Sequence, residues 1–165
     1  MIRPARAADH RALQEIERRA GERFRVIGMP EIADDEPYAE EDLAAAELLL
    51  VATDDAGDAV GYAMASLVDD HAHLDQLSVA PDQGGRGLGT ALIDAVVDWA
   101  RTRGDAEVTL TTFRDVPFNA PLYAKRGFTV LDEARWTAGL RAVVAREAAH
   151  GLDVTQRVVM RRPVQ

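Results

Sequence analysis

The sequence predicts an α/β fold, and three observations lead to this prediction. Segments with the apolar spacing of helices alternate with short segments that have the composition of β-strands. In the middle of the chain a strand, a glycine-rich turn and a long amphipathic helix follow one another, as they do in α/β units. The chain has 165 residues, of which 47% are hydrophobic and 28% charged, which are ordinary values for one globular domain.

The first half of the chain predicts a short strand, one long helix and three further strands. After a strand at residues 2–6, Asp9 is a plausible N-cap for a helix over about residues 10–23. Proline and glycine interrupt residues 25–42, where we expect a loop with a short helix. The expected strands are 48–53, 60–68 and 73–79, and Asp69-Asp70 has the composition of a hairpin turn.

The second half predicts one long helix, a strand, a short helix and a final group of three elements. An apolar stripe starts at Leu88 and continues to Trp99, and Gly104 suits the end of that helix. A strand at 108–112 precedes a short helix with Asn119 as N-cap and Gly127 at its end. The last expected elements are a strand at 128–131, a helix at 140–150 and a strand at 158–160.

Charge and cysteine content exclude several classes of function. Lysine and arginine number 19 against 28 acidic residues, so the net charge of −9 disfavours nucleic acid and membrane surfaces as partners. The absence of cysteine excludes disulfides, thiolate nucleophiles and cysteine zinc sites. Glu147 and His150 lack the spacing of a zinc helix, so we expect no metal. The first ten residues have no apolar signal-peptide core, and we expect a cytoplasmic protein.

The segment from Leu77 to Leu92 is the most informative part of the chain. Its four glycines, Gly84, Gly85, Gly87 and Gly89, lie within six positions between a strand and a helix. Such a turn leaves backbone N–H groups free to bind an anion, and the helix dipole adds positive potential there. Arg86 adds a full positive charge. We therefore expect a phosphorylated ligand, although a flexible turn with no ligand is the alternative.

Two familiar phosphate-binding loops do not fit this segment. The spacing from Gly84 to Gly89 matches a P-loop, but Thr90 stands where the essential lysine belongs. A dinucleotide fingerprint that began at Gly85 or Gly87 would have Thr90 or Leu92 in the position of its third glycine.

The glycine segment resembles the acyl-CoA signature of the GNAT family of N-acetyltransferases. Gly87 and Gly89 match the two small positions of that signature, whereas its polar first position falls on Gly84. A second segment, Asn119-Ala-Pro-Leu-Tyr-Ala-Lys-Arg-Gly-Phe128, is similar to a later helix of the family. The resemblance covers residues 3 to about 131. It implies a mixed, mostly antiparallel sheet of about six or seven strands flanked by helices, splayed between the fourth and fifth strands, in a single N-acetyltransferase domain over residues 1–165.

The resemblance also implies where acetyl-CoA, the co-substrate, would bind. The pyrophosphate would bind the main chain of the glycine turn, and the pantetheine arm would pair with the preceding strand. Asn119 would hold the pantetheine or the leaving group. The residues expected at the acetyl-CoA site are Leu77, Val79, Gly84, Gly85, Arg86, Gly87, Leu88, Gly89, Thr90 and Asn119.

Two side chains are candidates for the proton transfers of this chemistry. Tyr123 corresponds to the family's general acid, since a phenol can protonate the departing thiolate; the alternative is a core aromatic residue. His73 lies four residues before Leu77, where several family members place a base, but a solvated hairpin explains it equally well. The acidic residues between 34 and 42 would attract a cationic amine or would simply be a solvated loop.

The function that these features predict is transfer of an acetyl group from acetyl-CoA directly to a primary amine. The expected partner is a small-molecule amine acceptor, and the family resemblance makes a homodimer possible. One alternative is a protein N-terminal or lysine acetyltransferase. The other is an acyl-CoA-binding regulatory module without catalysis, which the presence of Asn119 and Tyr123 disfavours.

Overall fold

The computed structural model describes residues 1–165, and its strands form one mixed sheet of order β1-β2-β3-β4-β5-β7-β6. The strands are β1 (Ile2–Pro4), β2 (Leu48–Thr53), β3 (Ala59–Val68), β4 (His71–Val79), β5 (Glu107–Phe113), β6 (Thr129–Val130) and β7 (Arg157–Pro163). β4 and β5 are parallel, with His73 opposite Thr109, whereas β1/β2, β2/β3, β5/β7 and β6/β7 are antiparallel. The predicted mixed α/β fold is therefore confirmed, and the splay between the fourth and fifth strands stays a prediction.

The helices follow the predicted pattern with small shifts of their ends. They are α1 (His10–Val26), α2 (Pro30–Ala33), α3 (Glu40–Ala45), α4 (Leu88–Arg103), α5 (Ala120–Lys125) and α6 (Ala138–Ala149). The segment at 25–42 contains two short helices rather than one. Short 3₁₀ turns lie at Ala7–Asp9, Pro81–Gln83, Glu133–Arg135 and Val154–Gln156. None of these helices combines the length and the apolar character needed to cross a membrane.

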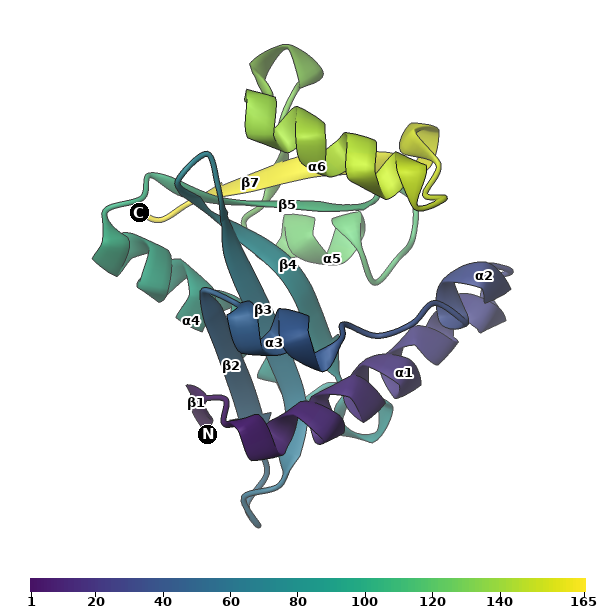
Figure 1. Ribbon diagram of the computed structural model, residues 1–165, viewed down its shortest axis with the longest axis vertical. Helices are drawn as coiled ribbons and strands as arrows, with labels where there is room; N and C mark the ends of the chain where they lie inside the picture. The colour runs from purple at the N-terminus through teal and green to yellow at the C-terminus, as the bar shows by residue number, and fades with distance from the viewer. The chain divides into compact units, whose positions relative to one another are not determined.

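The contacts group into two compact units, which we describe separately. The first comprises residues 1–65 and 76–96, and the second comprises residues 66–75 and 97–165. In the first unit α1 and α3 lie on the same face of β2 and β3 (Figure 1). The apolar spacing of α1 predicts this packing, because residues three and four apart share one face of a helix. The buried cluster consists of Leu13, Ile16, Leu43, Val51, Tyr62 and Met64.

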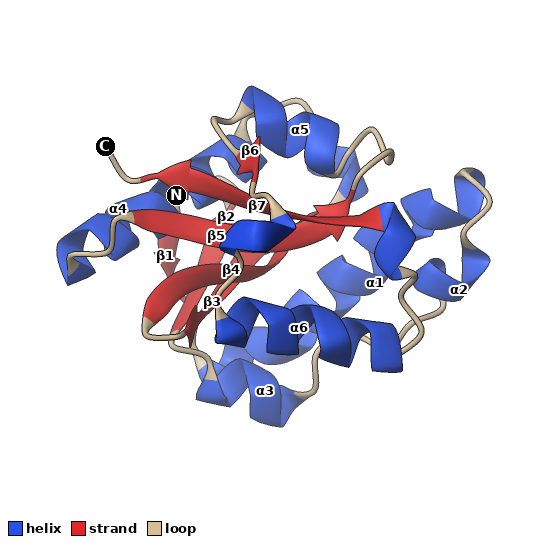
Figure 2. Cartoon of the chain, turned by 90° about the horizontal axis from the view of Figure 1, so that it is seen from above, coloured by secondary structure: helices blue, strands red, loops and turns tan.

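In the second unit α5 and α6 cover opposite faces of the β5/β7 pair (Figure 2). Leu140 of α6 packs with Leu131 and Val159 in a buried cluster. Trp136 packs against the same cluster, and its indole N–H donates to the Leu131 carbonyl at 3.0 Å. The indole is therefore held by both its apolar body and its polar edge, as is usual for a half-buried tryptophan.

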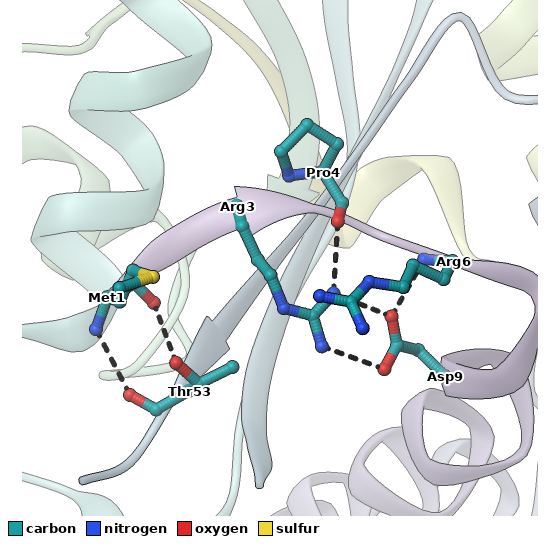
Figure 3. Close-up of polar contacts among 6 residues, drawn as sticks. All are labelled: Met1, Arg3, Pro4, Arg6, Asp9 and Thr53. Atoms are coloured by element: carbon teal, nitrogen blue, oxygen red, sulfur yellow. Dashed lines mark hydrogen bonds and ion pairs between the residues drawn. The ribbon is translucent and has the colours of Figure 1, made fainter. Parts of the chain in front are cut away.

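A polar network ties the beginning of the chain to α1 and β2 (Figure 3). The Arg3 guanidinium donates to both carboxylate oxygens of Asp9, at 2.8 and 3.0 Å, and the Arg6 N–H donates to the same carboxylate at 2.7 Å. The Met1 ammonium donates to the Thr53 carbonyl at 3.2 Å. Asp9 occupies the predicted N-cap position, but its carboxylate binds residues that precede it instead of capping α1. The Arg3 guanidinium lowers the pKa of Asp9 to about 2.

The hairpin turn between β3 and β4 is confirmed at Asp69 and Asp70, with φ of 51° and 61°. Two residues with positive φ are typical of a type I′ turn, which prefers asparagine, aspartate or glycine at its first central position and glycine at its second. The Asp69 carboxylate accepts the Gly139 N–H at the start of α6, at 2.8 Å. The Asp70 side chain is 91% exposed and makes a 3.6 Å ion pair with Arg103. The two aspartates thus have the same backbone conformation but different contacts.

We expect Asp9→Asn to lower the free energy of unfolding by about 1 kcal/mol at pH 7, because a charge-assisted bidentate pair is lost. The folded-state pKa of Asp9 lies below its ordinary value, so its contribution is complete above about pH 4 and is lost as the pH falls through about 2. Urea unfolding at pH 7 and at pH 2 measures this. An equal difference between the two proteins at both pH values would contradict the assignment.

We expect Asp70→Gly to raise the stability by up to about 1 kcal/mol, because glycine adopts positive φ without strain and an exposed ion pair contributes little. Asp69→Gly relieves the same strain but removes the acceptor of the Gly139 N–H, so it should destabilise the protein. Thermal unfolding of both variants checks the opposite signs. Stabilisation by both substitutions would show that the Asp69 contact to α6 contributes nothing.

Candidate active site

The turn between β4 and α4 has the backbone that its glycines predict. Gly85 and Gly87 have φ of +78° and +75°, where side chains are strained, and a Cβ at either position would meet open space. The residues from Gly84 to Gly87 are exposed. The turn is therefore open to a ligand along its main chain.

The amides at the start of α4 are oriented by the helix itself. The Ala91 N–H donates to the Gly87 carbonyl at 3.0 Å, so the amides of Leu88, Gly89 and Thr90 come before the first bond of the helical ladder. Such amides point out of the helix N-terminus, where the macrodipole supplies about half a positive charge. Together with Arg86 they give the entrance to α4 a positive local potential within a protein of net charge −9.

Close packing holds the start of α4 against the sheet. A Cβ on Gly61 of β3 would lie 3.1 Å from the Ser78 carbonyl oxygen and 3.5 Å from a Leu92 methyl group. Val79 lies beside both Gly61 and Gly89, at 3.4 and 3.9 Å from their ideal Cβ positions. Leu92 itself is fully buried. The small residues at 61 and 89 thus allow close contact between the sheet and the helix that carries the turn.

The predicted acyl-CoA residues Leu77 and Val79 lie on β4 just before the turn. The Ala80 N–H donates to the Val60 carbonyl of β3 at 2.8 Å. Backbone groups of successive residues in a strand point alternately to its two edges, so those of Ser78 also point toward β3. The backbone groups of Leu77 and Val79 therefore point away from β3.

Asn119 and Tyr123 lie at the beginning and in the middle of α5. The Asn119 amide oxygen accepts the Phe113 N–H at 3.4 Å, and its carbonyl accepts the Tyr123 N–H at 3.0 Å. The half-buried Tyr123 ring makes an edge-on contact with buried Phe128, with centroids 5.7 Å apart. Gly127, with φ of +90°, ends the helix and returns the chain to Phe128. Tyr123 is thus held at a defined place by its ring.

His73 is a buried residue with an internal partner. Only 2% of it is exposed, and its Nδ1 lies 2.8 Å from the Thr109 hydroxyl. Burial, assisted by the charge of Arg146, lowers its pKa to about 4. The histidine is therefore neutral at pH 7 and is a weak base.

An ion pair and hydrogen bonds hold the acidic segment at 34–42 against α1. Asp34 forms an ion pair with Arg25. The Tyr38 N–H donates to Glu17 at 3.1 Å, and Gln14 donates to the Tyr38 carbonyl at 3.0 Å. Burial raises the pKa of Glu17, which also accepts the Tyr62 hydroxyl. The segment is therefore an ordered part of the first unit, with some of its charge already paired.

One polar group was missed as a candidate in the sequence. Asp75 of β4 is half-buried and accepts the Ser66 hydroxyl at 3.0 Å. Burial raises its pKa to about 6. The sequence does contain a signal for this residue, namely a carboxylate between Leu74 and Leu77 inside a predicted strand. Burying an ionised group in a strand of the core costs free energy, so such a residue is unusual.

Comparison with known proteins gives the family. The model of the "Acetyltransferase (GNAT) family" matches residues 11–128. An uncharacterized N-acetyltransferase, YobR of Bacillus subtilis strain 168, is 29% identical over 68 residues, which are 41% of this chain and 28% of that protein. The chain thus matches less than a third of the length of that relative.

Solved structures show the same fold. The ribosomal-protein-S18-alanine N-acetyltransferase of Escherichia coli has a TM-score of 0.69 and 22% identity, over 100% of this chain and 94% of that one. The PaiA N-acetyltransferase of Thermoplasma acidophilum, solved with coenzyme A, has a TM-score of 0.66 and 19% identity, over 99% of this chain and 98% of that one. Nourseothricin acetyltransferase has a TM-score of 0.52 and 27% identity, over 72% of this chain and 65% of that one. Since the family model matches most of the chain and the fold agrees, the chain belongs to the GNAT family of acetyltransferases.

Proposed function

We propose that the protein is an acyl-CoA-dependent N-acetyltransferase that transfers an acetyl group from acetyl-CoA directly to a primary amine. The observation that carries the proposal is the open turn with Gly85 and Gly87 at positive φ, followed by the free amides of α4. Amides at a helix N-terminus bind a pyrophosphate with little reorganisation. The family and the coenzyme A complex of the Thermoplasma protein support the choice of ligand.

Main-chain groups hold the rest of the co-substrate in this proposal. The pantetheine arm contains amides, and Leu77 and Val79 direct their backbone groups away from β3, as pairing with such an arm requires. Gly84, Arg86, Leu88, Gly89 and Thr90 complete the predicted set around the pyrophosphate. Asn119 would contact the pantetheine or the leaving thiol through its side-chain amide.

The chemistry is a direct displacement. The lone pair of the neutral amine forms a bond to the thioester carbon, the carbon–sulfur bond breaks, and the thiolate takes a proton. The acylated nitrogen releases one proton, which restores the proton donor, so the products are the amide and the thiol. Tyr123 supplies that proton in the proposal, since its phenol is a better acid than water and the edge contact with Phe128 fixes its ring.

The acceptor is an amine whose size the fold does not define. By their names, one structural neighbour acts on an alanine of a ribosomal protein and another on nourseothricin, so similar folds serve proteins and small molecules. We propose a small-molecule amine, with a protein N-terminus or lysine as the alternative. Thiol release from acetyl-CoA with polyamines, aminoglycosides, amino acids and peptides separates these classes.

We expect Gly87→Ala to weaken acetyl-CoA binding about tenfold or more, because a residue with a Cβ at φ of +75° costs about 1–2 kcal/mol and moves the turn. Gly57→Ala is the matched control, since Gly57 has φ of +88° and open space around its Cβ position in another turn. Titration calorimetry measures both variants. Equal affinities in all three proteins would place the pyrophosphate elsewhere.

We expect Tyr123→Phe to lower kcat by about 10- to 100-fold with little change in acetyl-CoA affinity, because the ring packing on Phe128 remains and only the hydroxyl is lost. The assay is thiol release with the best amine of the panel, and Tyr38→Phe serves as a control outside α5. Unchanged kcat in Tyr123→Phe would remove the phenol from the mechanism.

A further inference from the structure

An ion pair between β7 and α6 lies mostly out of solvent and leaves one donor unsatisfied. Arg157, the first residue of β7, donates from Nη2 to Glu147 Oε1 and to the Thr111 hydroxyl, both at 3.1 Å. The Thr111 hydroxyl donates to the other oxygen of Glu147 at 2.6 Å. The Nε of Arg157 is buried and has no hydrogen-bond partner. A buried donor without a partner costs free energy, so the protein alone does not fully satisfy this guanidinium.

The Phe113 ring holds the same guanidinium at one end of β5. The Cζ atom of Arg157 lies 4.6 Å from the centroid of that ring, which is a cation–π contact, and the two residues are opposite each other in the β5/β7 pair. The Phe113 N–H donates to the Asn119 side chain at 3.4 Å. In the proposed function Asn119 contacts the pantetheine or the leaving thiol. A single residue, Phe113, therefore links the guanidinium to the place of acyl transfer.

The second half of α6 brings Glu147 to this guanidinium through few contacts. α6 lies over the β5/β7 pair (Figure 2), but its buried residues, Leu140 and Val143, are both in its first half. In the second half Val144 is partly buried, and most other residues are exposed. The Glu147 side chain itself keeps 24% of its surface exposed, against 12% for Arg157. Displacement of this one side chain would make Nη2 of Arg157 available to a ligand.

A ligand that takes the place of Glu147 has to be an anion. Leaving a buried guanidinium unpaired is costly, whereas exchanging one carboxylate for another keeps the ion pair. A guanidinium binds a carboxylate best through two parallel N–H···O bonds, and Glu147 receives a bond from Nη2 alone. A carboxylate bound to both Nη2 and Nε would also satisfy the donor that Glu147 leaves without a partner.

We propose that Arg157 binds a carboxylate of the amine acceptor in place of Glu147, and that the acceptor is therefore a free amino acid. The proposal rests on the proposed function and names the class of small-molecule amine that it uses. Glu147 pairs with the guanidinium while no acceptor is bound and competes with the acceptor for it. Amines without a carboxylate, such as polyamines, lack the group that replaces Glu147.

The kinetic test compares free amino acids with their amides, because each such pair differs in the carboxylate. The assay is thiol release from acetyl-CoA, and the probes are the amino acids of the amine panel and the amide of each. For the wild type we expect kcat/KM of the best free acid to exceed that of its amide at least about tenfold, since a site built for a polar group rejects the analogue that lacks it.

Variants of the two partners in the ion pair should change KM in opposite directions. Arg157→Lys keeps the charge but loses the planar fork, so KM for the free acid should rise about tenfold or more, with little change for the amide. Glu147→Gln removes the internal competitor, so KM for the free acid should fall about threefold or more. Arg161→Lys is the matched control, since Arg161 of the same strand pairs with Glu107 at 3.4 Å, and its ratio of acid to amide should stay at the wild-type value.

An ion pair with a purely structural role would give a different pattern. Both substitutions would then impair the enzyme in the same direction, for the acid and the amide alike. A higher KM for the free acid in both variants, or a wild-type ratio of acid to amide near one, would overturn the proposal and leave the proposed function standing. Wild-type protein that does not bind acetyl-CoA in calorimetry would instead overturn the proposed function.

Binding of product-like ligands gives a readout that needs no turnover. N-acetylglycine and N-acetylglycine amide differ in the carboxylate and are titrated into the coenzyme A complex. We expect the wild type to bind the acid at least about tenfold more tightly than the amide. The acid should also raise the melting temperature of Glu147→Gln more than the amide does, because it pairs with a guanidinium that is otherwise left alone. Equal affinities, or binding of neither ligand, would overturn the proposal.

Discussion

Main-chain N–H groups at the entrance to α4 are the constraint on which the account depends. They can face an anion only because Gly85 and Gly87 adopt positive φ, and because α4 packs closely on the sheet through Gly61 and Gly89. Neither condition involves a side chain that contacts the ligand. In the proposed function, a chain of net charge −9 would therefore hold a diphosphate by local dipoles and by Arg86.

The titratable side chains of β4 and α5 depend on a different kind of local order. Tyr123 is placed by an aromatic contact and by the glycine that ends α5, while Asp75 is placed by a strand and by burial. Burial acts in opposite directions on two titratable residues of β4: it lowers the pKa of His73 and raises that of Asp75. The same low-polarity setting thus weakens one base and strengthens the other.

Much of the fold could be predicted from the sequence because its signals are local. The apolar stripes of α1 and α4, the hairpin at Asp69-Asp70 and the glycines of the turn all follow from spacing or from the steric limits on φ. The segment at 25–42 was predicted less well, because Gln14 and Glu17 of α1 hold it through contacts distant in sequence. The side-chain role of Asp9 was missed because Arg3 competes for the carboxylate that would otherwise cap α1.

The residues of the candidate site also differ in how far the sequence alone predicts them. The glycine turn could be recognised from residue types alone, since few other sequences satisfy its backbone. The difference between the pKa shifts of His73 and Asp75 could not be predicted from residue types. It depends on which of the two side chains the fold buries completely and on which charged residues of α6 lie near them. Asp69 likewise contacts Gly139, seventy positions away, which no local pattern indicates.

Backbone ¹⁵N–¹H spectra recorded during titration with coenzyme A test the central claim most directly. We expect the largest changes at the amides of Gly85 to Thr90, with further changes at Leu77 and Val79, while the amides of Gly57 and Gly104 in other turns stay in place. Saturable binding that leaves the amides of the β4–α4 turn unchanged would contradict it.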